Sequence, residues 1–149
     1  MKIVAKTDVG MVRESNQDSY TTGELPNGVA WAVVCDGMGG ASGGNVASST
    51  AVKVIAEQIT SSFRPGMSAK SIKNMMVSAI NAANISVYDI SCSNSELYGM
   101  GTTVVCAIVM EHTAYIAHAG DSRAYIVSHG ALTQLTRDHS VVQELVEHG

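Results

Sequence analysis

The stretch Val33-Val34-Cys35-Asp36-Gly37-Met38-Gly39-Gly40 decides how this chain folds. It completes an apolar run, residues 30–35, whose length and content are typical of a buried strand. One carboxylate, Asp36, follows this run, and a buried carboxylate is costly unless a positive group meets it. The glycines after it let the backbone turn sharply and let a ligand approach the main chain. The stretch therefore predicts either a metal-binding carboxylate on a rigid strand end or a strand-to-helix turn whose Asp accepts local N–H groups.

The composition indicates one globular domain over residues 1–149. Hydrophobic residues make up 46% of the chain and charged residues 15%, which is enough apolar material for a core. The net charge of −4 argues against a nucleic-acid partner held through its phosphates. The three cysteines have no C-x-x-C spacing, which disfavours a zinc site or a disulfide framework. The start is too polar for a signal peptide and no apolar run could span a bilayer, so we expect a cytoplasmic protein with no membrane partner.

A predicted hairpin brings two carboxylates together. Residues 18–22 and 29–35 have the content of strands, and the turn residues at 24–28 predict a loop between them. Antiparallel pairing places the start of one strand beside the end of the next. We therefore expect Asp18 and Asp36 to lie close together in the folded chain.

The remaining pattern predicts two helices and then a second β region. Asn45 is the expected N-cap of the first helix, and Ser68 that of the second. The other expected elements are a strand over 2–6, strands over 102–110, 113–119, 123–128 and 131–135 that form a meander, and a short helix or the start of a lid over 141–147. Segregated helices and antiparallel hairpins predict an α+β fold, a β-sandwich of antiparallel sheets flanked by helices.

Three aspartates, Asp18, Asp36 and Asp121, stand at strand ends near glycine. Hard oxygen ligands without His or Cys suit Mg²⁺ or Mn²⁺ better than zinc. Arg13 lies close in sequence to Asp18, and its planar fork could clamp a phosphate, although a surface salt bridge is the competing reading. Asp121 could equally belong to an ordinary tight turn. Two metals about 3.5–4 Å apart can activate water for in-line attack, so the residues favour metal-assisted phosphoester hydrolysis.

Five motifs occur in order along the chain. They are Arg13-Glu14-Ser15-Asn16-Gln17-Asp18, Asp36-Gly37-Met38-Gly39-Gly40, Gly101-Thr102-Thr103, Gly120-Asp121-Ser122-Arg123 and Leu135-Thr136-Arg137-Asp138-His139-Ser140. Together they closely resemble the bacterial metal-dependent protein serine/threonine phosphatases of type 2C, the PPM family. The resemblance covers essentially the whole chain and implies the N-terminal portion of that catalytic domain, with α-β-β-α layers.

The resemblance implies a role for each candidate residue. Asp36 would bridge two Mg²⁺ or Mn²⁺ ions, and the backbone carbonyl of Gly37 would bind the first of them. Asp18 would serve the second ion, and Asp121 a third, looser one. Arg13 would bind the substrate phosphate. The implied substrates are phosphoproteins, targets of a serine/threonine kinase.

The chain also departs from the family pattern. Two further metal-binding aspartates of the family, in Asp-Gly and Asp-Asn sequences, have no counterpart after Asp138. Ala41 and Met38 stand where relatives carry a histidine, and Asn45 where many carry a glutamate. The domain is thus expected to be C-terminally incomplete, with exposed sheet edges that invite a homo-oligomer. The alternative function is a catalytically inactive, truncated or regulatory phosphatase-like binding module.

Overall fold

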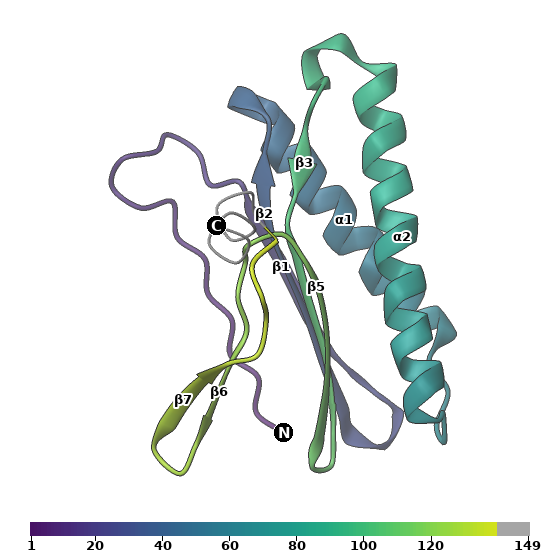
Figure 1. Ribbon diagram of the computed structural model, residues 1–149. Helices are drawn as coiled ribbons and strands as arrows, with labels where there is room; N and C mark the ends of the chain where they lie inside the picture. The colour runs from purple at the N-terminus through teal and green to yellow at the C-terminus, as the bar shows by residue number, and fades with distance from the viewer. Residues whose placement is uncertain (140–149) are drawn as a thin grey trace, which may run out of the picture.

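The computed structural model describes residues 1–139, apart from the side chains of Ala41 and Ser42. The short helix or lid expected over 141–147 lies outside the described residues. The elements run in the order β1 (Asp18–Leu25), η1 (Pro26–Gly28), β2 (Val29–Met38), α1 (Gly40–Ser62), α2 (Ala69–Ser93), η2 (Ser95–Leu97), β3 (Gly101–Thr102), β4 (Val104–Met110), β5 (Thr113–Ala119), β6 (Tyr125–Ser128) and β7 (Ala131–Gln134) (Figure 1).

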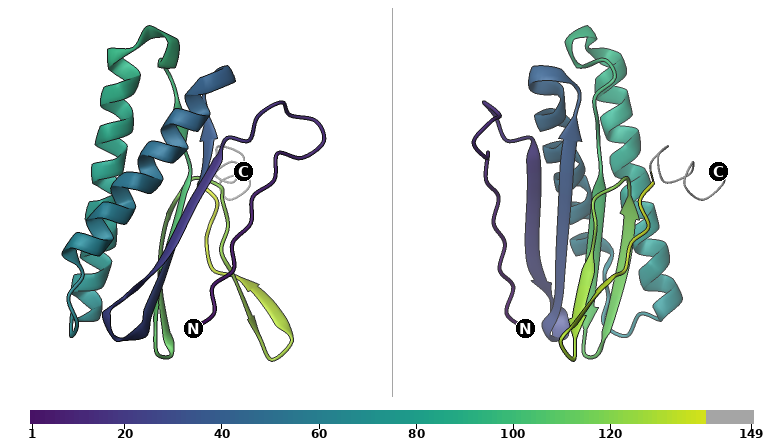
Figure 2. Two further views of the ribbon diagram at one scale, coloured as in Figure 1. Left: turned by 180° about the vertical axis from the view of Figure 1, so that it is seen from behind. Right: turned by 60° about the vertical axis from the view of Figure 1, so that its left-hand side comes forward.

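The strands form two antiparallel sheets. The larger has the order β1-β2-β4-β5, with β3 paired to the end of β2, and the smaller is the β6-β7 hairpin. Both long helices lie on one side of the larger sheet, and the N-terminal segment runs along the other side (Figure 2). The α+β class with antiparallel sheets is confirmed. Within residues 1–139, however, helices cover one face only, and the second sheet of the expected sandwich consists of β6 and β7.

Alternation along β2 separates the core from the open side of the sheet. Val33 and Cys35 are fully buried, whereas Val34 and Asp36 are exposed. Because successive side chains of a strand point to opposite faces, the apolar set of β2 packs under the helices and Asp36 faces away from them. Ile55 of α1 contributes to the same core and is also fully buried. The core therefore fixes β2 rigidly and leaves its polar end accessible.

Three local expectations were wrong. Residues 2–6 form no strand; instead, this segment lines small cavities on the open face of β1 and β2. The first helix begins at Gly40 and not after Asn45, because the small residues at its start allow a helical turn to pack against the end of β2. Strands β5 and β6 are not paired within residues 1–139, so the expected meander is divided into two separate hairpins.

Other boundaries follow the sequence closely. Ser68 caps α2 by accepting a hydrogen bond from the backbone N–H of Ser71 at 3.2 Å. The tight turns expected after β4 and after β6 both form, with positive φ angles at Glu111 and His129. Within residues 1–139, neither long helix is apolar enough over its length to cross a membrane.

The three cysteines are expected to differ in reactivity. Cys35 and Cys106 are fully buried, and burial raises the pKa of each thiol to about 12, while Cys92 is exposed. Because the thiolate is the reactive form, the two buried thiols should resist modification. A colorimetric thiol reagent should label Cys92 rapidly in the native protein and the other two only after unfolding. Rapid labelling of all three under native conditions would contradict this core.

Candidate functional site

The pairing of β1 with β2 places Asp18 directly opposite Asp36. This confirms the expectation from the hairpin, since the start of β1 meets the end of β2. Side chains of residues directly opposite in an antiparallel pair lie on the same face with Cβ atoms roughly 4.5–5.5 Å apart. Like charges in this arrangement are destabilising. The fold therefore holds together two carboxylates that repel each other.

The electrostatics of Asp36 link it to the other candidate residues. Burial raises the pKa of its carboxyl, and the charge of Asp18 raises it further. The charge of Asp121 acts in the same direction, whereas the Arg13 guanidinium lowers the pKa. All four side chains thus act on one region, in which negative charge exceeds positive charge. A bound cation would relieve this repulsion.

Two cavities adjoin at Asp36. The larger, of about 620 Å³, is lined by Arg13, Asp36, Gly37 and Asp121 among others. The smaller, of about 240 Å³, is lined by Arg13, Asp18 and Asp36. Arg13 and Asp36 border both cavities. The structure therefore brings the five residues singled out in the sequence to one solvent-accessible region at the end of the sheet.

The donors in these cavities suit a hard divalent cation. Carboxylate and carbonyl oxygens are available, and neither cavity is lined by His or Cys. This chemistry fits Mg²⁺ or Mn²⁺. Among residues 1–139, no three Asp, Glu, His or Cys side chains converge closely enough to form a metal cluster on their own. Asp121 thus borders the site without joining the Asp18–Asp36 pair.

A separate cavity of about 460 Å³ lies between α2 and β3 and is mostly apolar. It has no charged lining residue, and Met38 is the side chain that it shares with the larger polar cavity. A charged ligand or a metal ion would therefore be held in the polar region around Asp36 and not in this cavity.

Sequence reasoning missed two threonines that hold the main chain of Asp36. The Asp36 N–H donates to Thr103 Oγ1 at 3.1 Å, and the Thr103 N–H donates to the Asp36 carbonyl at 2.9 Å. Thr102 Oγ1 also donates to the Asp36 carbonyl, at 3.0 Å. The only sequence signal was the Gly101-Thr102-Thr103 motif, to which no role was given.

Gln17 is a further missed residue and joins three elements. The backbone carbonyl of Gln17 accepts a hydrogen bond from the Gly37 N–H at 3.1 Å. Its side-chain Nε2 donates to the backbone carbonyl of Gly40 at 2.7 Å. The start of β1, the end of β2 and the first turn of α1 are thereby tied together. This arrangement fixes the backbone on both sides of the candidate metal-binding carboxylates.

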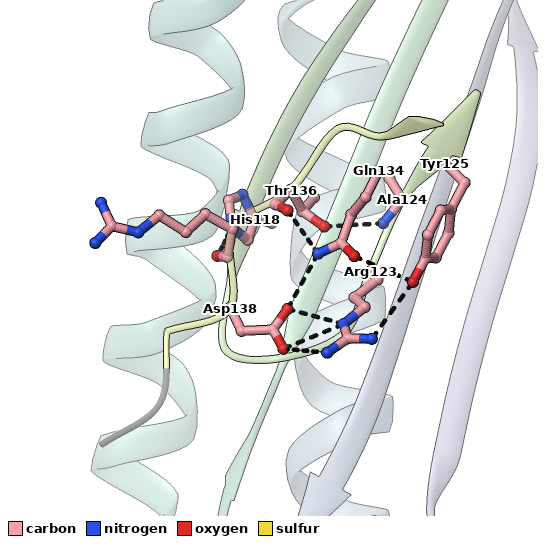
Figure 3. Close-up of polar contacts among 8 residues, drawn as sticks. His118, Arg123, Ala124, Tyr125, Gln134, Thr136 and Asp138 are labelled. Carbon is pink, nitrogen blue, oxygen red and sulfur yellow. Dashed lines mark hydrogen bonds and ion pairs between the residues drawn. The ribbon is translucent and has the colours of Figure 1, made fainter. Parts of the chain in front are cut away.

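The loop that carries Asp121 is anchored by a polar network (Figure 3). Arg123 Nε donates to both carboxylate oxygens of Asp138, at 2.9 and 3.1 Å, and its Nη2 lies 2.6 Å from Oδ2. The His139 N–H donates to the Gly120 carbonyl at 2.9 Å, and the Ala124 N–H donates to Thr136 Oγ1 at 3.1 Å. The segment after β7 therefore lies against the loop before β6.

The Arg123–Asp138 pair predicts a local dependence on pH. Hydrogen bonding to the Arg123 guanidinium lowers the pKa of the Asp138 carboxyl. A depressed carboxyl pKa means that the stabilisation is present above the ordinary Asp pKa and is lost as the pH falls through the folded-state value. Asp138→Asn should speed amide hydrogen exchange at His139 at neutral pH, and this difference from the unmutated chain should shrink in acid. Equal exchange rates at neutral pH would contradict the anchoring role.

Known proteins match almost the whole of this chain in sequence. Residues 12–146 match the family model described as protein phosphatase 2C. The serine/threonine phosphatase stp of Listeria monocytogenes serotype 4b is 36% identical over 144 residues, which are 97% of this chain and 57% of that protein. Protein PstP of Mycobacterium tuberculosis, a serine/threonine protein phosphatase, is 32% identical over the whole chain and is matched over 27% of its own length. The chain thus spans less than three fifths of these curated relatives.

Solved structures share the fold. The Streptococcus agalactiae serine/threonine phosphatase superimposes with a TM-score of 0.87 at 34% identity, covering 97% of this chain and 58% of that one. The PstP catalytic domain, solved in complex with two manganese ions, superimposes with a TM-score of 0.79 at 32% identity over 97% of this chain and 58% of that one.

Proposed function

From the premise that the chain belongs to the protein phosphatase 2C family, we propose that it contributes to a metal-dependent enzyme that hydrolyses phosphoserine and phosphothreonine in proteins. The observation that supports this most strongly is the β1–β2 register, which sets Asp18 opposite Asp36 beside Arg13. Relatives with this fold are named serine/threonine phosphatases, and one contains manganese. Phosphoproteins made by a serine/threonine kinase are the proposed substrates.

The proposed metal ligands are the carboxylates of Asp18 and Asp36 and the backbone carbonyl of Gly37. Asp121, at the border of the larger cavity, is proposed for a third and weaker site. Two Mg²⁺ or Mn²⁺ ions, and a third at the weaker site, would supply Lewis acidity and a water nucleophile at neutral pH. The remaining ligand positions of hard cations are readily filled by water.

Arg13 is the proposed phosphate ligand. Among residues 1–139, it is the only cationic side chain that lines either polar cavity. A guanidinium can hold two phosphate oxygens at once and orient the phosphorus toward the carboxylate pair. Its positive charge also offsets part of the repulsion around Asp36. Arg13→Ala is therefore expected to raise the KM for a phosphate ester more than it lowers kcat.

An assay of aryl phosphate hydrolysis with added Mn²⁺ tests the proposal. An aryl phosphate is the appropriate substrate because its leaving group departs without a proton donor. Hydrolysis should require Mn²⁺, saturate with substrate and disappear in Asp36→Asn. If the chain neither binds Mn²⁺ in calorimetry nor hydrolyses the ester, the alternative function holds, and the chain is a catalytically inactive binding module.

Self-association is also proposed, because both the larger sheet and the β6–β7 hairpin expose apolar side chains. Val34, Val127 and Leu132 are all exposed, and β1 and β5 end the larger sheet within residues 1–139. Unpaired strand edges and apolar surface favour pairing between copies. Light scattering at increasing concentration should show a mass above that of one chain, 15.6 kDa. A constant monomer mass would contradict this.

A further inference from the structure

Thr103, which lies between β3 and β4, occupies the position directly opposite Asp36 on the side away from β1. The register that pairs Val34 with Val105 in β4 also pairs Gly37 with Thr102 in β3, so the residue facing Asp36 between them is Thr103. Asp36 is thus flanked by Asp18 on one side and by Thr103 on the other. Thr103 is buried, although it borders the larger polar cavity.

The hydrogen bonding between these two residues departs from a regular ladder. Facing residues of a hydrogen-bonded antiparallel pair exchange two backbone N–H···O bonds. Here the Thr103 N–H makes the expected bond to the Asp36 carbonyl, but the Asp36 N–H donates to the Thr103 hydroxyl. A side chain thereby replaces a backbone carbonyl as the partner of the candidate metal-bridging residue. A hydroxyl-free side chain would leave this N–H without that acceptor.

The same hydroxyl reaches the loop that carries Asp121. Thr103 Oγ1 lies 2.6 Å from the hydroxyl of Ser122. The Thr103 methyl group also abuts Gly120, where an added Cβ would come within 2.7 Å of it and where φ is +99°. One side chain thus contacts the residues immediately before and after Asp121 and the backbone of Asp36.

We propose that Thr103 is a positioning residue that couples Asp36 to the Asp121 loop and thereby sets the spacing of the acidic groups around the metal ions. This inference rests on the proposed function and adds to it a residue outside the ligand set. Groups that orient metal ligands through hydrogen bonds typically affect metal affinity or activity by about 10–100-fold. A merely structural threonine would affect folding stability but not metal affinity.

The test compares Mn²⁺ binding by calorimetry in variants of the full 149-residue chain. Thr103→Val keeps the shape and removes the hydroxyl, and it should weaken Mn²⁺ binding about tenfold. Thr103→Ser keeps the hydroxyl but loses the methyl contact with Gly120. Its Mn²⁺ affinity should lie within about threefold of that of the unmutated chain. Ser91→Ala is the matched control, because Ser91 is also buried, its hydroxyl accepts a backbone N–H, that of Gly99, and it lines neither polar cavity. It should lower the Tm in EDTA and leave the Mn²⁺ affinity unchanged.

A double-mutant cycle adds a second readout. Ser122→Ala should weaken Mn²⁺ binding in the unmutated chain but have no further effect once Thr103→Val is present, because the two hydroxyls act as one unit. If Thr103→Val binds Mn²⁺ as tightly as the unmutated chain, or if Thr103→Ser is as impaired as Thr103→Val, the positioning role is overturned while the proposed function stands. If the unmutated chain binds no Mn²⁺, the proposed function fails and this inference fails with it.

Discussion

Asp36→Asn is expected to abolish Mn²⁺-dependent hydrolysis and, at the same time, to raise the Tm of the metal-free protein. An asparagine amide is a weaker metal ligand than the proposed bridging carboxylate, so the loss of activity should exceed the roughly 100-fold typical of the groups that merely orient ligands. The gain in stability follows from the electrostatics. Burial and the charges of Asp18 and Asp121 raise the pKa of the Asp36 carboxyl, so the folded state disfavours its ionised form.

The sign of this effect can be checked by pH. A carboxyl with a raised pKa contributes stability below its ordinary pKa and loses that contribution as the pH rises through the folded-state value. Removal of one like charge from a facing pair should raise the free energy of unfolding by about 0.2–1 kcal/mol. The Tm should therefore rise by no more than about 2–4 °C at neutral pH. The difference between Asp36→Asn and the unmutated chain should vanish in acid, where Asp36 is neutral.

Thermal unfolding in EDTA from pH 4 to pH 8 measures this directly. Asp89→Asn is the matched control, because it removes the same charge from an exposed position on α2. A metal-free Asp36→Asn protein that is less stable than the unmutated chain at neutral pH would show that the carboxylate pair is not under repulsion.

Gly37→Ala is expected to be the most destabilising single methyl addition in the described part of the chain. A Cβ at residue 37 would lie 2.0 Å from the Gly44 carbonyl oxygen and 2.8 Å from that of Gln17. Both are backbone atoms of α1 and of the segment before β1, so no flexible side chain can move aside. Overpacking commonly costs about 1–3 kcal/mol, and this contact belongs at or above the upper end of that range.

Gly101→Ala is the control for this substitution. A Cβ at residue 101 meets only the Met38 side chain, at the ordinary contact distance of 3.6 Å. Urea denaturation should therefore show a loss of about 3 kcal/mol for Gly37→Ala and little change for Gly101→Ala. Equal unfolding midpoints for the two variants would mean that the end of β2 and the start of α1 are less closely packed than described.

The sequence predicted the features that depend on local pattern. The apolar run before Asp36, the turn residues at 24–28 and the strand pattern after Asp18 together predicted a hairpin, and with it the meeting of the two carboxylates. Ser68 could be predicted as a cap because its role involves residues three positions apart. Such features need no knowledge of the tertiary structure.

The features that were missed depend on contacts between distant segments. The bond between Asp36 and Thr103 spans 67 positions, and nothing in the immediate neighbourhood of either residue requires it. Asn45 was a reasonable cap by residue type, but α1 starts earlier because Gly44 packs against the backbone of Gly37. A run of glycines has two readings, a flexible turn or a close backbone approach, and only the packed structure distinguishes them.

Calorimetric titration of Mn²⁺ into the unmutated chain, Asp18→Asn, Asp36→Asn and the double variant tests the central claim most directly. The claim is that β1–β2 pairing creates one shared cation site from the two carboxylates. The expected result is Mn²⁺ binding to the unmutated chain, a marked loss in each single variant and no further loss in the double variant. Mn²⁺ binding that is unaffected by Asp18→Asn, or losses that simply add in the double variant, would contradict it.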